Sequence, residues 1–389
     1  MKIIFRITRQ NRYSVVALSG AVATKKPYVK IHYAESIDEV TLVSPPAVVA
    51  YSFMSFDLPW IEHEVKTLSK MGYTLIAGGA HATARPEECL SLGFNHVFIG
   101  DGEENILRFI DGERLRVFDG LEKRVDLDDY PPFNPVHSMY MPVEISRGCP
   151  FNCSYCETPL IAGKKVRHRS IDSVIYYAKI GLKNGKRVAR FISPNAFAYG
   201  SENGITPNVE FIELLLFQLK ELNMREIYFG TFPSDVRPES VTQDVLKVLR
   251  KYVKNRHITV GAQSGSNAIL RKIKRGHTVE TINQAVEVIL ENGFIPVLDF
   301  IFGFPFETDE DIEQTVFLIN RLVKQGAKIH AHTFMPLPGT ELENAGAGDV
   351  PKDLRKTLGR LASMGHLNGF WEKQRLLAKQ LAKGFSSPS

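Results

Sequence analysis

Residues 142–340 alternate short apolar segments with amphipathic stretches, and this rhythm restricts the chain to few folds. Strands are predicted to begin near residues 143, 188, 226, 257, 295 and 328. The stretches between them end at glycines, and N-terminal helix caps are predicted at 240–243 and 308–311. Parallel strands joined by right-handed helical crossovers curl into a barrel, and six such units make an incomplete one. We therefore expect a partial (β/α)6 barrel with its ligand-binding groups at the C-terminal ends of the strands.

Residues 1–115 show a second α/β pattern, in which apolar strands again alternate with helices. The predicted elements are strands at 2–6, 47–53, 73–78 and 96–100 and helices at 59–71 and from about residue 103. Buried parallel strands form open sheets, which bind ligands at the carboxyl ends of their strands. Glycine-containing turns follow residues 78 and 100, at two such ends. A Rossmann-like domain is therefore predicted for residues 1–115.

Two further segments complete the predicted α/β organisation. A chain of 389 residues exceeds a usual single core, so several domains are expected. Residues 116–141 are rich in Pro and Asp, which excludes a continuous helix or central strand and predicts a linker. Residues 341–389 predict a helical C-terminal region. Its expected apolar face consists of Leu354, Leu358, Leu361, Met364, Trp371, Leu376, Leu377 and Leu381.

Charge and hydropathy exclude some classes of protein. The formal net charge is +5 without a dense Lys/Arg run, so a nucleic-acid partner is not indicated. No apolar run is long enough to span a bilayer, and the first residues turn polar too early for a signal peptide. The expected location is the cytoplasm.

Three of the four cysteines lie within eight residues, in the spacing C-x3-C-x2-C formed by Cys149, Cys153 and Cys156. They follow directly on the first predicted barrel strand. A disulfide framework would spread its cysteines and pair them evenly, so this cluster indicates a metal site in a reducing compartment. The fourth cysteine, Cys89, is isolated, and we expect it to be a buried apolar side chain.

The segment 146–156 resembles the radical SAM (S-adenosylmethionine) superfamily, whose hallmark is this spacing with an aromatic residue, here Tyr155, before the last cysteine. The resemblance implies a [4Fe–4S] cluster held by the three thiolates, with SAM bound to the remaining iron and cleaved to a 5′-deoxyadenosyl radical. The alternative is a zinc site that adds His168 to the cysteines. Zinc loops usually come as paired C-x2-C knuckles, which this sequence lacks.

The resemblance extends over the barrel and implies further contacts with SAM. The residues are Tyr155, Ser193, Asn195, Ser234, Arg237, Gln263, Ser264, Gly303 and Pro336. Arg237 suits the SAM carboxylate, and the alternative is a surface arginine that pairs with Asp235 or Glu239. His330 and His332 alternate to one face of a strand, and both a functional role and a core role remain open for them.

The N-terminal block resembles the cobalamin-binding domain that precedes the barrel in some radical SAM proteins. The residues that the resemblance places at cobalamin are Ser52, Ser55, Gly78, Gly79, His81, Ala82, Thr83, Gly100, Gly102 and Glu103. The D-x-H-x-x-G motif that puts a histidine under cobalt is absent from the sequence. The expected cobalamin is therefore base-off without a histidine ligand, and the alternative is a domain that has lost the cofactor.

The predicted function is a cobalamin-dependent radical SAM methyltransferase that acts on an unactivated carbon of an unidentified substrate. A flavodoxin or ferredoxin is the expected electron donor. The first alternative is a radical SAM enzyme without cobalamin that catalyses rearrangement, cyclisation or dehydrogenation. A methylthiotransferase would need a second cluster, for which only Cys89 remains. The last alternative is a zinc-stabilised binding module.

Overall fold

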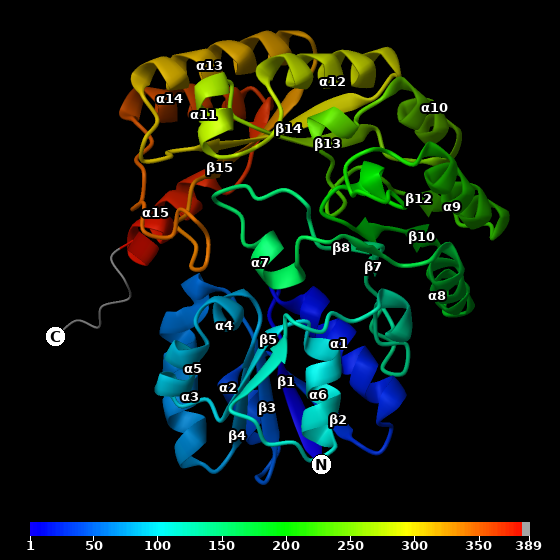
Figure 1. The fold of residues 1–389 in the computed structure, drawn as a ribbon, viewed down its shortest axis with the longest axis vertical. Coiled ribbons are helices and arrows are strands. Elements are labelled where there is room, and N and C mark those ends of the chain that lie inside the picture. The colour runs from blue at the N-terminus through cyan, green and yellow to red at the C-terminus, as the bar shows by residue number, and fades with distance from the viewer. Residues whose placement is uncertain (383–389) are drawn as a thin grey trace. The chain divides into compact units, whose positions relative to one another are not determined.

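The computed structural model describes residues 1–382, which form two compact units (Figure 1). The first unit comprises residues 1–143, 157–163 and 169–186. The second comprises residues 144–156 and 164–168 and continues from Arg187. Within residues 1–382, no helix is both long and apolar enough to cross a bilayer.

The first unit is built on a six-stranded parallel sheet in the order β2-β1-β3-β4-β5-β6. Its strands are β1 (Lys2–Arg6), β2 (Lys30–Ala34), β3 (Val48–Ser52), β4 (Thr74–Gly78), β5 (His96–Gly100) and β6 (Val117–Gly120). Side chains such as Ile3, Phe5 and Phe118, each at most 1% exposed, form its core. This sheet confirms the predicted Rossmann-like fold.

The helices of the first unit include several that the sequence analysis did not predict, among them the first one. The helices are α1 (Arg12–Lys25), α2 (Ile37–Thr41), α3 (Leu58–Lys70), α4 (Ala80–Ala84), α5 (Pro86–Leu92), α6 (Gly102–Ile110), α7 (Thr158–Ala162) and α8 (Ile171–Lys183). Helices α1 and α6 lie side by side (Figure 1). Gly20 in α1 permits close contact, because a Cβ there would lie 2.5 Å from the Phe133 carbonyl oxygen. The predicted helices at 59–71 and from about residue 103 are confirmed as α3 and α6.

The segment predicted as a linker, 116–141, belongs entirely to the first unit. Strand β6 joins the edge of its sheet, and Phe118 is fully buried there. Further along, the buried Asn134 side chain donates to Ser19 Oγ at 3.2 Å and to Tyr33 OH at 3.0 Å. The unit therefore extends beyond the predicted boundary at residue 115, because apolar and amide side chains past that point find partners in it.

The second unit contains the predicted barrel strands. They are β7 (Val143–Glu144), β10 (Val188–Ala189), β12 (Glu226–Ile227), β13 (His257–Gln263), β14 (Ile295–Phe302) and β15 (Lys328–Thr333). Strands β13, β14 and β15 form a parallel sheet together with β16 (Leu367–Asn368). The first strands pair in smaller groups, β10 with β12 and β7 with β11 (Phe191–Ile192). Strand β8 (Ser146–Arg147) pairs antiparallel with β9 (Arg167–His168). All six predicted strand starts are confirmed.

Most helices of the second unit lie on the outer side of these strands, whereas the last one packs against the face of β15 that carries His332 (Figure 1). The helices are α9 (Val209–Glu221), α10 (Gln243–Tyr252), α11 (Asn267–Lys272), α12 (Val279–Glu291), α13 (Asp309–Lys324), α14 (Lys352–Ser363) and α15 (Trp371–Ala382). The capping box at Thr308 is confirmed. The cap predicted at 240–243 is wrong in position: Thr242 caps α10, because the Ser240 hydroxyl donates to the Arg237 carbonyl oxygen instead.

Within residues 341–382 the predicted helical region contains α14 and α15 with β16 between them, and residues 341–351 form turns and irregular chain instead. In α14, Leu354, Leu358 and Leu361 are at most 5% exposed, as predicted. Met364 is 61% exposed and Leu376 is 54% exposed, so their placement on the apolar face is wrong. Two residues of this region, Leu367 and Asn368, pair as β16 with the last barrel strand, which ends the run of helical residues between α14 and α15.

Candidate active site

The three clustered cysteines lie on a loop that follows β8 in the second unit. Gly148 has φ +96°, a conformation that favours glycine, and turns the chain into the loop. Cys153 is buried, and Cys149 and Cys156 are partly exposed. The Ser154 amide donates to the Ile273 carbonyl oxygen at 3.1 Å, so distant backbone fixes the middle of the loop.

Two buried guanidinium groups approach the Cys153 sulfur. Arg275 Nη1 lies 3.6 Å from Cys153 Sγ, and Arg237 Nη1 lies 3.9 Å from it. Burial raises the pKa of the Cys149 thiol, and the neighbouring Cys156 and Cys153 raise it further. The positive charge of Arg237 acts in the opposite direction and lowers this pKa. Thiolates gathered in this way need positive charge or metal to offset their repulsion. Three thiols with two adjacent cations therefore fit an anionic iron–sulfur cluster.

The histidine proposed for the zinc alternative does not join the cysteines. His168 Nδ1 lies 2.9 Å from Ser146 Oγ, and its Nε2 lies 3.0 Å from the Ser201 carbonyl oxygen. Both ring nitrogens therefore have protein partners, and the set of ligands for a mononuclear zinc site is incomplete.

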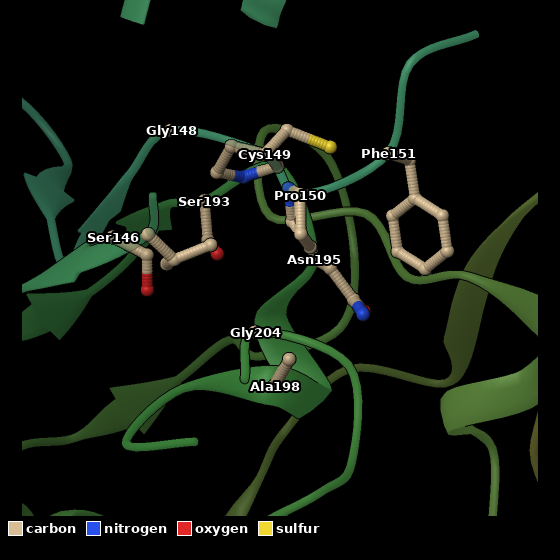
Figure 2. A pocket seen from close by; sticks show the side chains of 11 residues that line it. Ser146, Gly148, Cys149, Pro150, Phe151, Ser193, Asn195, Ala198 and Gly204 are labelled. Carbon is tan, nitrogen blue, oxygen red and sulfur yellow. The ribbon is translucent and has the colours of Figure 1, made fainter. Parts of the chain in front are cut away.

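A small pocket of about 10 Å³ lies beside Cys149 and is lined by Ser193 and Asn195. Figure 2 shows the Cys149 sulfur and the Asn195 amide pointing towards the side on which the Phe151 ring lies. Ser193 Oγ and Asn195 Nδ2 are buried and have no hydrogen-bond partner within residues 1–382. Buried polar atoms are costly when unpaired, so these two can bind an ordered water or a single polar group of a ligand in a pocket of this size.

The side chain of Arg237 is only 3% exposed, so it is not a surface arginine. Its Nε donates to Glu239 Oε1 at 2.5 Å, and its guanidinium lies 3.4 Å from the centre of the Phe151 ring. Burial opposes ionisation of Glu239, but hydrogen bonding to His277 and the Arg237 charge lower the pKa of Glu239 to about 2. The predicted alternative partner Glu239 thus holds Arg237, and a contact with the SAM carboxylate remains a prediction.

Two predicted SAM-contacting hydroxyls are occupied by the chain itself. Ser234 Oγ donates to the Thr231 carbonyl oxygen at 2.9 Å. Ser264 is fully buried, with its Oγ 3.3 Å from Thr315 Oγ1. Thr315 lies in α13, and the next residue of the loop, Gly265, allows this helix to approach closely, because a Cβ at Gly265 would lie 2.5 Å from Thr315 Cα. These residues join the loop after β13 to helix α13.

A larger cavity of about 250 Å³ is lined by Tyr155 and Gln263. Strand β13 has an irregular register between Gly261 and Gln263, and Gln263 has φ +75°. This bulge re-aims the Gln263 side chain towards the cavity. Of the other two predicted SAM residues, Pro336 is buried and stands in the sequence between Met335 and Leu337, which line this cavity. The Gly303 amide donates to Glu307 Oε2 at 2.8 Å.

Substitution of Gln263 separates backbone strain from ligand contact. We expect the Gln263→Gly variant to be about 1 kcal/mol more stable in its free energy of unfolding than the Gln263→Ala variant, because glycine adopts the positive φ without strain and alanine does not. Both variants lose the amide, so both are expected to bind SAM about 10-fold more weakly. Urea denaturation and equilibrium SAM binding measure the two effects. Equal stability of the two variants would contradict the strain, and unchanged SAM binding would contradict the contact.

Sequence reasoning did not single out two carboxylates of the second unit. Asp299 lies on β14, where Leu298 and Phe300 on either side are fully buried; a lone acidic residue in an apolar strand was the available signal. Glu307 accepts from the Gly303 and Phe304 amides, and burial raises its pKa to about 7. The two histidines singled out on β15 lie beside Asp299, with His330 Nδ1 2.9 Å from Asp299 Oδ1.

The residues predicted to bind cobalamin gather along the C-terminal edge of the first unit's sheet. Three of them end strands: Ser52 ends β3, Gly78 ends β4 and Gly100 ends β5. The others lie at the starts of the elements that follow: Ser55 begins the short helical turn after β3, Gly79 precedes α4, which contains His81, Ala82 and Thr83, and Gly102 and Glu103 begin α6. Their polar groups mostly bond to the chain.

The hydroxyl and glycine positions of this edge serve the unit's own packing. Ser52 Oγ lies 2.9 Å from Ser14 Oγ, and Ser55 Oγ lies 2.9 Å from His81 Nδ1. Thr83 Oγ1 donates to the Gly79 carbonyl oxygen and accepts from the Gly100 amide. In the described part of the chain, buried His81 Nε2 has no hydrogen-bond partner and lies 3.5 Å from Glu88 Oε2. The donors at this edge therefore do not by themselves form a cobalamin site.

Protonation of His81 is expected to destabilise the first unit in acid. Burial, with a contribution from Arg85, lowers its pKa from 6.5 to about 4. The unfolded chain thus binds the proton first, so the stabilisation is complete above pH 6.5 and is lost as the pH falls towards 4. The loss should reach about 2 to 3 kcal/mol by roughly pH 4.5. Urea denaturation of wild type and His81→Gln tests this, and parallel pH dependences would contradict it.

Comparison with known proteins places the barrel in a family. The family described as "Radical SAM superfamily" matches residues 143–319. A tRNA-2-methylthio-N(6)-dimethylallyladenosine synthase of Petrotoga mobilis is 30% identical over 289 residues, covering 72% of this chain and 63% of the relative. The chain thus spans less than two thirds of the length of this curated relative.

Two solved structures share the fold across most of the chain. The radical S-adenosylmethionine methyltransferase TsrM of Kitasatospora setae, with cobalamin and a [4Fe–4S] cluster bound, gives a TM-score of 0.67 at 13% identity, covering 88% of this chain and 76% of TsrM. The cobalamin-dependent radical enzyme OxsB, with aqua-cobalamin bound, gives 0.61 at 14% identity, covering 88% of this chain and 54% of OxsB. Residues 143–319, which carry the cysteine loop and most of the partial barrel, match the radical SAM superfamily.

Proposed function

We propose that this protein is a radical SAM enzyme and, more specifically, a cobalamin-dependent methyltransferase that acts on an unactivated carbon. The observation that carries the first part is the grouping of three thiols on one loop, with Arg275 and Arg237 against the Cys153 sulfur. The second part is supported by the fold that the chain shares with TsrM and OxsB.

The chain's own residues would hold and shield the cofactors. When bound, a [4Fe–4S] cluster with one open iron supplies the electron for the reductive cleavage of SAM. The unpaired atoms of Ser193 and Asn195 offer hydrogen bonds to SAM beside Cys149. Tyr155 lines the larger cavity and packs edge-on against Phe304, with ring centres 6.0 Å apart, which keeps water from this side of the loop.

Methylthio transfer, which the name of the curated relative describes, is less compatible with this chain. It would need a second cluster, and Cys89 is the only cysteine outside the motif. Cys89 is fully buried, and burial raises the pKa of its thiol to about 12. A neutral, enclosed thiol is a poor metal ligand.

A radical SAM enzyme without cobalamin is the second candidate, and one observation favours it. The hydroxyls of Ser52, Ser55 and Thr83, which the resemblance placed at cobalamin, already have partners in the chain. Such an enzyme would catalyse rearrangement, cyclisation or dehydrogenation.

Anaerobic reconstitution with iron, sulfide and hydroxocobalamin distinguishes these functions. The proposed enzyme should retain about four irons per chain and one corrinoid, and should convert SAM into both 5′-deoxyadenosine and S-adenosylhomocysteine. 5′-Deoxyadenosine alone, without bound corrinoid, would establish the second candidate. A colourless protein that holds zinc and no iron would refute both.

A further inference from the structure

Strands β14 and β15 bring one carboxylate and two imidazoles to a single face of the barrel sheet. Along both strands, fully buried residues alternate with half-buried ones, and Asp299, His330 and His332 belong to the half-buried set. Asp299 and His330 are direct partners in the parallel register, and His332 follows two residues later on the same face. Asp299 and His332 line the 250 Å³ cavity that also contains Tyr155 and Gln263.

The ligand atoms of these three residues converge. His330 Nδ1 lies 2.9 Å and His332 Nε2 lies 3.8 Å from Asp299 Oδ1, and all three atoms lie within 4.8 Å of one another. Metal–nitrogen and metal–oxygen bonds of about 2.0–2.2 Å put neighbouring ligand atoms roughly 3–3.5 Å apart. Small side-chain movements are therefore enough to enclose an ion.

In the part of the chain that the structure describes, the two imidazoles are the only basic groups that pair with Asp299. Asp235, on the loop after β12, has a buried Oδ1 that finds no hydrogen-bond partner among residues 1–382. Among residues 1–382, neither Asp235 nor Asp299 forms an ion pair with lysine or arginine. Two carboxylates in a partly enclosed space favour a bound cation.

We propose that Asp299, His330 and His332 bind a single divalent transition-metal ion at the wall of the cavity. Two imidazole nitrogens and one carboxylate suit zinc, iron(II) or cobalt(II) rather than magnesium or calcium, which prefer oxygen ligands. Three protein ligands leave at least one coordination position open, and this position faces the cavity, where it can take an oxygen or nitrogen atom of a substrate. None of its three ligands belongs to the cysteine motif, and the site does not depend on cobalamin.

Gln374 adds an orienting contact to His332. Its Nε2 lies 3.3 Å from His332 Nδ1, while its Oε1 accepts from the Thr333 amide at 3.0 Å. Metal binding at His332 Nε2 places the ring proton on Nδ1, so the bound state requires the Gln374 amide to turn its oxygen towards that proton.

Cobalt(II) titration of the tag-free, full-length Cys149→Ala/Cys153→Ala/Cys156→Ala variant tests the site without competition from cluster thiols. One equivalent should bind, with weak visible d–d bands and no thiolate charge-transfer band. Asp299→Asn and His332→Ala in the same background should reduce affinity at least about 100-fold, and His63→Ala, an exposed histidine of α3, should not. Far-ultraviolet circular dichroism checks that each variant is folded.

The same question is answered independently in the reconstituted holoenzyme. After equilibration with zinc, wild type should carry one zinc per chain in addition to its cluster iron, and Asp299→Asn should carry the iron without the zinc. Absence of cobalt(II) binding in the cysteine-free variant, or equal metal content in wild type and Asp299→Asn, would overturn the proposal. Neither result would alter the test of SAM cleavage.

Discussion

The Cys153→Ala variant is expected to hold no [4Fe–4S] cluster after reconstitution and to cleave SAM at least about 10³-fold more slowly than wild type. Loss of a residue that only contacts a metal ligand typically lowers metal affinity or activity 10–100-fold. Cys153 is itself a predicted ligand, so a larger loss is expected. It is also the buried member of the three thiols and the one that both guanidiniums approach. Its removal leaves two cysteines for a cluster that needs three. Iron and sulfide content and the rate of 5′-deoxyadenosine formation measure the effect.

Cys89→Ala is the matched control. Cys89 is fully buried in the first unit, so its loss should cost about 1 kcal/mol of stability for the removed sulfur. Iron content and SAM cleavage should stay at the wild-type level. An active, iron-containing Cys153→Ala variant would remove the basis of the proposed function. An iron-free Cys89→Ala variant would show that the fourth thiol contributes to cluster binding.

The barrel could be predicted because its strands and their limits are local features of the sequence. Strand β14 alternates buried and half-buried residues along its whole length, and α13 has a complete capping box at Thr308. Helix α1 could not be predicted in the same way. Its Val15–Ala23 stretch consists of small, apolar or hydroxyl residues, most of them buried, so no polar face marks a helical period. Only the surrounding unit makes this segment helical.

The candidate site was predicted in position but not in its bonding. The motif placed Ser264 at the end of a barrel strand, which is confirmed, but its hydroxyl partner Thr315 lies 51 residues further along the chain. The role of Arg275 was missed for the same reason, because Cys153 lies 122 residues before it. Local spacing reveals which residues share a loop or strand end. It does not reveal which distant side chain has already taken up their hydrogen bonds.

Arg275 combines two tasks that a single substitution removes. The side chain is 9% exposed, with Nη1 3.6 Å from Cys153 Sγ and Nη2 2.8 Å from the Gly261 carbonyl oxygen. Gly261 has no room for a Cβ, which would lie 2.5 Å from Arg275 Nη2. The loop bearing the cysteines and the end of β13 are therefore joined through one guanidinium.

Arg275→Ala should lower the reduction potential of the reconstituted cluster by on the order of 100 mV, because a unit charge about 4 Å away contributes up to about 4 kcal/mol at an effective dielectric constant of 20. Loss of a positive charge disfavours the reduced, more negative state, so the shift is downward. The unpaired Gly261 carbonyl should also cost about 1–3 kcal/mol of stability. Arg275→Lys keeps the charge but not the fork of donors, so it should restore most of the potential and less of the stability.

Exposed Arg271 of α11 is the control, and Arg271→Ala should change neither quantity. A redox titration followed by electron paramagnetic resonance gives the potential, and equal values for Arg275→Ala and Arg271→Ala would show that the guanidinium does not act on the cluster.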